Sequence, residues 1–240
     1  MAKILVIGGG AMGSAFTIPC LDNKNNVTIT EPYSKQFINN LKSKNKFHSV
    51  LKIKLPKKLK FRIFSKELLK EKFNLIVIAL SLPGINFISK ELKNIKNKTP
   101  ILILTKGLKY DKKRNKILTI SEQIKIDTKN KNISVLKGPC LAKELAKKNQ
   151  TKVIIANKNI NIAKKIGKLI STNYYLVEYS TDIIGVEVCS AIKNIYAMVI
   201  GAGQSLNMSS SLFQKSLIEM KYLTKYFNGK DATVESLAGV

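Results

Sequence analysis

The sequence predicts an α/β fold with a doubly wound, mostly parallel sheet, followed by an incomplete all-α domain. Short apolar runs alternate with longer amphipathic stretches up to about residue 180, and only helical patterns follow. A glycine-rich turn also joins the first strand to the first helix. We expect one domain over residues 1–180 and the start of a helical domain over residues 181–240. The expected strands are 3–7, 27–30, 60–63, 75–80, 101–104, 133–137, 152–156 and 174–179; the expected helices are 12–20, 34–44, 66–71, 84–95, 117–125, 140–148, 160–171, 182–201 and 209–227.

The turn after the first strand has the pattern G-x-G-x-x-G. An apolar run from Ile4 to Ile7 leads into Gly8-Gly-Gly-Ala-Met-Gly13, where a helical stretch begins. This is the fingerprint of a Rossmann-type sheet: its glycines permit a tight turn, close approach of a pyrophosphate and close helix–strand packing. The N–H groups at the helix start favour an anion. The residues expected to bind a dinucleotide are therefore Gly8, Gly10, Ala11, Met12 and Gly13.

An acidic residue follows the second expected strand. Glu31 lies 21 residues after Gly10, where an acid binds the ribose 2′-hydroxyl and disfavours a 2′-phosphate. NAD is thus expected in preference to NADP, which stays open. Pro19 should end or kink the first helix early, because proline has no N–H to donate.

Composition narrows the class of protein and its partners. The net charge is +27, but only Arg62 and Arg114 are arginines. A nucleic-acid site would show clustered arginine with interleaved aromatic residues, so we expect no nucleic-acid partner, although the positive field would attract anionic substrates. Three widely spaced cysteines lack metal-ligand spacing, which predicts reduced thiols and no metal. No signal peptide is evident and no apolar run reaches transmembrane length, so we expect a cytoplasmic protein with no membrane span.

One lysine interrupts the apolar helix expected over 182–201. Burying an ammonium group is costly, so Lys193 either snorkels to the surface or is needed inside the fold. Polar and small residues recur beside it at helical spacing and form a stripe that could line a cleft: Glu187, Ser190, Asn194, Ala197 and Gly201.

Two turns follow expected strands at the edge of the sheet where ligands bind. Thr105-Lys-Gly107 follows the strand 101–104, so Lys106 is either a substrate residue or an ordinary exposed turn lysine. Gly138-Pro-Cys140 follows the strand 133–137 and either presents N–H groups to an anion or simply starts a helix. His48, the only histidine, lies in a lysine-rich stretch expected to be an exposed loop, and we expect it on the surface.

Together these motifs resemble the NAD(P)-dependent glycerol-3-phosphate dehydrogenase family over essentially the whole chain. The matching segments are Gly8–Gly13, Ile53–Leu59, Thr105–Leu108, Gly138–Glu144, Glu187–Asn194 and Asp231–Gly239. The resemblance implies an NAD(P)-dependent oxidoreductase that interconverts sn-glycerol 3-phosphate and dihydroxyacetone phosphate, in the supply of glycerophospholipid precursors.

The resemblance also implies roles for individual residues. Lys193 would accept the proton during alcohol oxidation, and Asn194 would help to bind the substrate beside it. Lys106 would bind the substrate near the reacting carbon and border the dinucleotide. The remaining implied contacts are Gly138 and Cys140 with the substrate, and Ala142 with the dinucleotide. A desolvated lysine near a second cation has a lowered pKa, which suits a base near neutrality.

The chain departs from this family at two places. Cys140 stands where the family usually has serine, which replaces a hydroxyl with a weaker thiol donor. Beyond Val240 the family continues with an aspartate and an arginine–asparagine pair that holds the phosphate. Lysine lacks the arginine fork for bidentate phosphate recognition, so we expect a helical domain truncated relative to the family.

Two alternatives stay open beside an active dehydrogenase. The chain could be a dinucleotide-binding remnant that has lost catalysis, or a related two-domain hydroxyacid or ketopantoate reductase. A homodimer, in which another subunit supplies missing contacts, also stays open.

Overall fold

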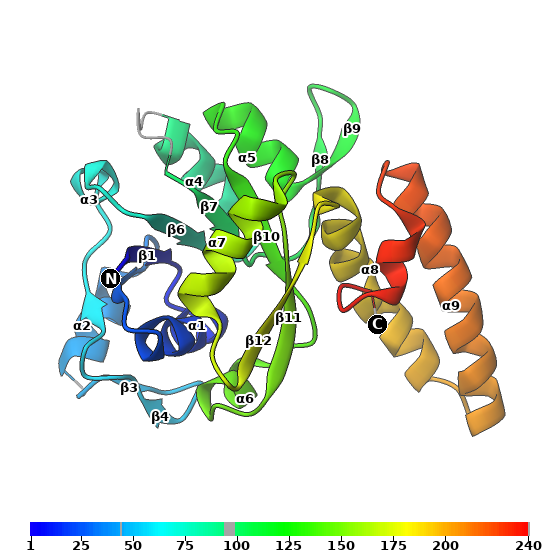
Figure 1. The fold of residues 1–240 in the computed structure, drawn as a ribbon, viewed down its shortest axis with the longest axis horizontal. Coiled ribbons are helices and arrows are strands. Elements are labelled where there is room, and N and C mark those ends of the chain that lie inside the picture. Colours follow the sequence, from blue (N-terminus) through cyan, green and yellow to red (C-terminus); the bar gives the residue numbers. More distant parts are fainter. Residues whose placement is uncertain (44, 94–98, 240) are drawn as a thin grey trace.

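The computed structural model describes residues 1–43, 45–93 and 99–239. Its centre is an eight-stranded sheet with the order β12-β11-β10-β7-β6-β1-β2-β5, shown in Figure 1. All neighbouring strands run parallel except the antiparallel pair β10–β11. The strands of this sheet are β1 (Lys3–Ile7), β2 (Asn26–Thr30), β5 (Lys60–Phe61), β6 (Leu75–Ile78), β7 (Ile101–Ile103), β10 (Ile133–Lys137), β11 (Thr151–Ala156) and β12 (Tyr175–Ser180).

Helices cover both faces of the sheet, which confirms the doubly wound fold. The helices whose buried side chains join one apolar core are α1 (Ala11–Asp22), α2 (Lys35–Ser43), α6 (Ala142–Ala146) and α7 (Ile160–Ile170). Those on the opposite core are α3 (Lys66–Lys70), α4 (Gly84–Lys93), α5 (Ile120–Thr128) and the first half of α8 (Ile183–Gly201). The inner strands are buried on both faces because these helices remove both from water.

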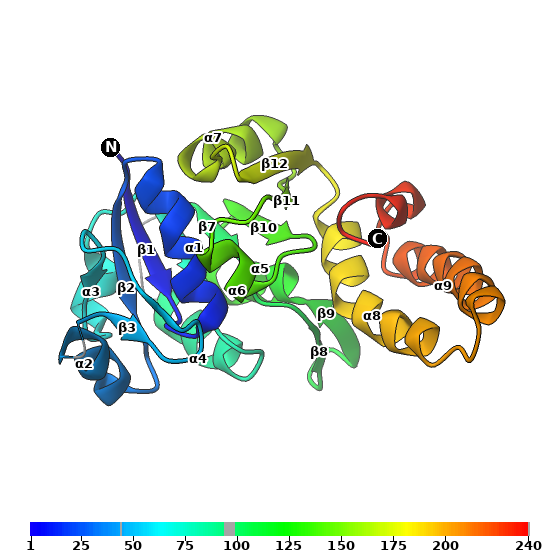
Figure 2. The ribbon, with the colours of Figure 1, turned by 90° about the horizontal axis from the view of Figure 1, so that it is seen from below.

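The chain after the sheet is helical, as the sequence predicts. Helix α8 packs against α9 (Leu206–Tyr226) and the short 3₁₀ helix η1 (Asp231–Glu235), and the three extend beyond one edge of the sheet (Figures 1 and 2). Asp182 caps α8 by accepting the N–H of Gly185 at 2.9 Å. Its second carboxylate oxygen accepts the N–H of Lys230 at 2.8 Å and the hydroxyl of Thr233 at 2.6 Å. One carboxylate therefore joins the start of α8 to η1.

Two features of the first half differ from the sequence predictions. Pro19 does not end α1 early: the helix continues to Asp22, and Pro19 is buried in its last turn. The 117–125 segment is not all helix, because β9 (Lys116–Thr119) pairs with β8 (Leu108–Asp111) before α5 begins. Thr119 then caps α5 in a capping box with Glu122.

The lysine-rich segment is also not simply an exposed loop. It contains the hairpin of β3 (Phe47–His48) and β4 (Ile53–Lys54), and three of its leucines join the core. The surface prediction for His48 is wrong: its ring is 1% exposed, receives the N–H of Leu51 at 3.2 Å and lies 3.2 Å from the carbonyl oxygen of Gly9. His48 therefore contacts the glycine loop through the carbonyl group of Gly9.

Helix α8 is long and apolar enough to correct the expectation that no segment reaches transmembrane length. By length and composition alone its 19 residues could cross a membrane, and 33% of that window is buried inside the protein. Its first half nevertheless buries Glu187 and Ser190 against the sheet, and it pairs with α9. These contacts are those of a helix in a folded domain, which passes the same length test.

Candidate active site

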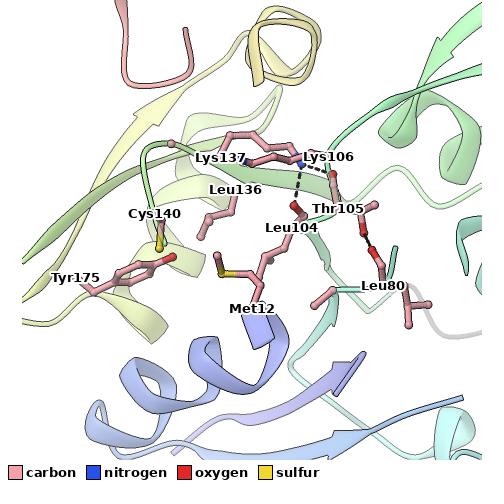
Figure 3. Close-up of a pocket in the computed structure, with 11 residues that line it drawn as sticks. Met12, Leu80, Leu104, Thr105, Lys106, Leu136, Lys137, Cys140 and Tyr175 are labelled. Carbon is pink, nitrogen blue, oxygen red and sulfur yellow. Dashed lines mark hydrogen bonds between the residues drawn. The ribbon is translucent and has the colours of Figure 1, made fainter. Parts of the chain in front are cut away.

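A cavity of about 280 Å³ opens where three neighbouring strands of the sheet end (Figure 3). It lies beyond the carboxyl ends of β6, β7 and β10 and beside the start of α1, where ligands bind in doubly wound sheets. Its lining residues are Met12, Ala79, Leu80, Leu104, Thr105, Lys106, Leu136, Lys137, Gly138, Cys140 and Tyr175. The cavity thus brings Met12 of the glycine-rich segment together with the two turns that the sequence singled out.

The glycine loop has the shape that a dinucleotide needs. Gly8 has φ +118°, a conformation that favours glycine. A Cβ at Gly13 would overlap the carbonyl oxygen of Gly8 and lie 3.1 Å from Cβ of Ala79, so glycine permits α1 to pack tightly there. A Cβ at Gly10 would meet nothing within 4 Å, and Gly10 offers no side-chain cap to α1. The first N–H groups of α1 therefore face open space, which suits a pyrophosphate.

Glu31 lies beside this loop, directly after β2. Its carboxylate accepts the N–H of Gly9 at 2.7 Å and that of Tyr33 at 3.1 Å. These bonds hold the acid at the glycine turn, on the side where the second strand ends. The position fits a group that meets the adenosine ribose, although Glu31 does not line the cavity described above.

The Thr105-Lys-Gly107 turn is held by its neighbours on both sides. The Thr105 hydroxyl donates to the carbonyl oxygen of Leu80 at 2.7 Å, which ties the turn to β6. Gly107 has φ +129°, so a side chain there would be strained. Lys106 itself is exposed and lines the cavity.

The turn after β10 forms the opposite wall. Gly138 has φ +134°, and a Cβ there would lie 3.0 Å from Cα of Val153. Burial raises the pKa of the Cys140 thiol to about 11, with the Lys106 charge acting against the rise and Glu144 adding to it. Ala142 lies at the start of α6 and packs against the core beside α1, outside the cavity lining.

Helix α8 brings Lys193 toward the same region. Lys193 is half-buried, and burial lowers its pKa, with the Lys106 charge adding to the effect. Asn194 is exposed on α8, and neither residue is among those that line the cavity.

Among the cavity residues that sequence reasoning missed, two carry polar groups. Lys137, at the end of β10, is 2% exposed, and Tyr175, at the start of β12, is fully buried with a hydroxyl that has no hydrogen-bond partner among the described residues. The signal for Lys137 was present: a charged residue ends an otherwise apolar strand at the ligand-binding edge. Tyr175 gave no such signal.

The glycine loop, the acid after β2 and the cavity at the strand ends define a dinucleotide-binding protein of the Rossmann class. No group of three or more His, Cys, Asp or Glu residues that could hold a metal ion occurs within the described ranges 1–43, 45–93 and 99–239.

Comparison with known proteins identifies the family. Residues 3–163 match the N-terminal profile of NAD-dependent glycerol-3-phosphate dehydrogenase, and residues 182–240 match the C-terminal profile. The chain belongs to this family. It is 29% identical to the NADP(+)-dependent glycerol-3-phosphate dehydrogenase of Archaeoglobus fulgidus over 98% of this chain and 73% of that protein.

Two further relatives agree with this assignment. The glycerol-3-phosphate dehydrogenase [NAD(P)+] of Clostridium botulinum is 29% identical over 100% of this chain and 72% of its own length. The crystal structure of glycerol-3-phosphate dehydrogenase from Coxiella burnetii matches with a TM-score of 0.85 and 25% identity, over 99% of this chain and 73% of that one.

Proposed function

We propose that this chain interconverts sn-glycerol 3-phosphate and dihydroxyacetone phosphate with NAD(H) or NADP(H). The observation that carries the proposal is the cavity that Met12, at the start of α1, shares with Thr105 and Lys106 and with Gly138 and Cys140. The family assignment rests on both parts of the chain, because separate profiles match its sheet and its helices. Neither profile is that of a hydroxyacid or ketopantoate reductase.

The residues present fit a nicotinamide dinucleotide. Gly8, Gly10, Ala11, Met12 and Gly13 would hold the pyrophosphate through the turn and the uncapped start of α1. Glu31 would contact the adenosine ribose, and Lys106 and Ala142 would border the cofactor. When bound, the nicotinamide supplies or accepts the hydride. The protein must then manage one proton and the substrate's negative charge.

Lys193 is our candidate for proton transfer. In alcohol oxidation its neutral amine would take the hydroxyl proton, and in the reverse direction its ammonium would protonate the carbonyl oxygen. The lowered pKa supports this role, because a base works best when its pKa lies near the working pH. Since burial is the larger cause and Lys106 the smaller, removing the Lys106 charge should raise the pKa of Lys193 only in part.

The remaining candidate residues would hold the substrate. Lys106 offers an exposed ammonium at the cavity and would attract the oxygen atoms around the reacting carbon. Gly138 and Cys140 would line the pocket opposite, and Asn194 would assist beside Lys193. Because the pKa of Cys140 is about 11, its sulfur would meet the substrate as a neutral thiol.

Preference for NAD over NADP is proposed on Glu31 alone. A carboxylate at the end of β2 would repel a 2′-phosphate. In Glu31→Arg, the ratio of NADPH affinity to NADH affinity should rise by about tenfold or more. An unchanged ratio would remove Glu31 from cofactor selection.

The experiment for the activity compares the purified protein with two lysine variants. NADH oxidation is followed with dihydroxyacetone phosphate in wild type, in Lys193→Ala and in Lys165→Ala, whose lysine is exposed on α7. Wild type and Lys165→Ala should turn over, and Lys193→Ala should lose about a hundredfold or more of the rate. NADH binding without turnover in wild type would support the remnant alternative.

We also propose a homodimer, with the boundary between domains at residues 180–181. The boundary is supported by the end of β12 at Ser180 and the start of α8 at Ile183. The dimer is supported by large apolar side chains that are exposed on α8 and α9: Ile195, Met198, Val199, Leu206, Met208, Phe213, Ile218, Tyr222 and Tyr226. Exposed apolar side chains gathered on two packed helices favour a protein contact. Sedimentation should give twice the chain mass, and Met198→Lys should shift it toward a monomer; a monomeric wild type would refute the dimer.

The cytoplasm is the proposed location. All three cysteines are free thiols in the structure, with Cys20 and Cys189 buried, as in a reducing compartment. Fractionation of cells that express the protein, with recovery in the soluble fraction, would support this proposal, and recovery in membranes would contradict it.

A further inference from the structure

Lys137 is a buried cation beside the proposed substrate site that the chemistry above does not use. It ends β10, is 2% exposed and lines the cavity. Its ammonium donates to the carbonyl oxygen of Leu104 at 3.3 Å and also to that of Thr105 (Figure 3). Both carbonyl groups belong to the segment that leads into Lys106.

A charge in this position is costly to keep. The pKa of Lys137 is lowered to about 8, mainly by burial; Glu187 on α8 acts against this shift, and the Lys106 charge adds a smaller lowering. An apolar residue would fill the same space without this cost. The two carbonyl oxygen atoms, however, would then lose their donor, and buried carbonyl groups are normally bonded.

We propose that Lys137 is a positioning residue for Lys106: its ammonium fixes the Thr105–Lys106 peptide and so aims the Lys106 side chain at the substrate. The Thr105 carbonyl belongs to the peptide that joins it to Lys106, so holding this oxygen sets the orientation of the turn. The Thr105 hydroxyl already fixes the turn to β6. Lys137 adds the second attachment, from β10, and the turn is held between the two strands.

The strand that bears Lys137 also packs against α8, the helix that bears Lys193. Glu187, the acid that attracts Lys137, lies on α8 and is 2% exposed. It is fixed in turn by Ser121, whose N–H donates to its carboxylate at 3.1 Å and whose hydroxyl donates to it as well. This inference rests on the proposed function, in which Lys106 binds the substrate.

Kinetics of a small set of variants test the inference. Lys137→Met keeps the length of the side chain and removes its donors; Lys137→Arg keeps charge and donors; Lys60→Met changes an exposed strand lysine as a control. Lys137→Met should raise KM for dihydroxyacetone phosphate and lower kcat, with kcat/KM down by about tenfold or more and the NADH dissociation constant within about twofold. Lys137→Arg should recover most of the loss, and Lys60→Met should match wild type.

A double variant separates positioning from independent action. If Lys137 works through Lys106, adding Lys137→Met to Lys106→Met should cost little beyond the single Lys106→Met change. Losses that multiply would overturn the inference. So would a Lys137→Met protein that melts at a lower temperature but keeps the wild-type kcat/KM, since that result describes a purely structural lysine.

A second readout does not depend on turnover. The amine of Lys106 can be labelled with pyridoxal 5′-phosphate, and the modified site located by mass spectrometry. In Lys137→Met the site has one positive charge fewer to attract the anionic reagent, and the turn that presents the Lys106 amine is held less firmly, so labelling should slow by about threefold or more. An unchanged rate would overturn the positioning role, even if wild type showed no dehydrogenase activity and the proposed function failed.

Discussion

Gly10 and Gly13 belong to the same glycine-rich motif but have different surroundings. Alanine at Gly13 should lower stability, whereas alanine at Gly10 should weaken cofactor binding. A Cβ at Gly13 would overlap the carbonyl oxygen of Gly8 and approach Cβ of Ala79 at 3.1 Å. A Cβ at Gly10 would meet nothing within 4 Å, and Gly10 has φ −62°, which alanine adopts without strain. Gly13→Ala should therefore disturb folding, whereas Gly10→Ala should disturb only the space reserved for the pyrophosphate.

The expected magnitudes differ clearly. Forcing a methyl group into packed backbone costs about 1–3 kcal/mol, which for a chain of this size lowers the melting temperature by roughly 3–10 °C. Gly10→Ala should change the free energy of unfolding by less than about 1 kcal/mol, because the entropy lost by the unfolded chain offsets a slightly poorer N-cap. Its NADH dissociation constant should nevertheless rise by about tenfold or more, because the methyl group blocks the approach to α1.

Two measurements on each variant decide the matter. Thermal unfolding by circular dichroism gives the melting temperature, and NADH fluorescence titration gives the dissociation constant. Gly10→Ala with wild-type stability and weakened binding is the predicted result. A Gly10→Ala protein that binds NADH like wild type would refute the placement of the cofactor at this loop.

Three further predictions concern buried groups. Tyr175→Phe should raise the free energy of unfolding by about 1 kcal/mol, because it removes a buried hydroxyl with no partner among the described residues; a less stable variant in urea titration would reveal a partner. The partly buried Cys140 should react slowly with iodoacetamide at pH 8 and faster as the pH approaches its pKa of about 11; fast alkylation at pH 7, measured by mass spectrometry, would contradict the raised pKa. Between pH 8 and 10.5 the stability of wild type should rise relative to Lys137→Met, because unfolding raises the pKa of Lys137 and the unfolded chain then binds more protons; parallel stability curves would contradict that depressed pKa.

The central sheet could be predicted because its signals are local. The runs 3–7 and 133–137 coincide with β1 and β10, and the glycine pattern fixed the start of α1. Buried parallel strands between covering helices are almost wholly apolar, so their limits are visible in the sequence. The alternation also predicted that no strand of the large sheet follows β12 in the part of the chain that the structure describes.

The two hairpins and the burial of His48 could not be predicted in this way. The residues joining β8 to β9 are nearly all polar, and their pairing depends on a turn in which Asn115 has φ +48°. His48 is buried because Leu51, Leu55 and Leu59 hold the lysine-rich segment against the core. Both outcomes depend on contacts between segments, which composition does not reveal.

The cavity was predicted in part. The carboxyl ends of parallel strands pointed to Lys106 and to the Gly138 turn, and both line it. Lys137 was overlooked because a lysine at a strand end is usually exposed in a chain with this many lysines. Only the packing of α8 against β10 shows that the Lys137 ammonium is buried and that Glu187 on α8 favours its charged form.

The most direct test of the proposed activity follows the hydride itself. Purified protein is incubated with dihydroxyacetone phosphate and NADH that carries one deuterium at C4. The two C4 epimers of this NADH are used in separate reactions, and each product is analysed by mass spectrometry. We predict glycerol 3-phosphate with one deuterium at C2 from one epimer and none from the other, and no product with Lys193→Ala. Unlabelled product from both epimers, or no product from wild type, would contradict hydride transfer at this site.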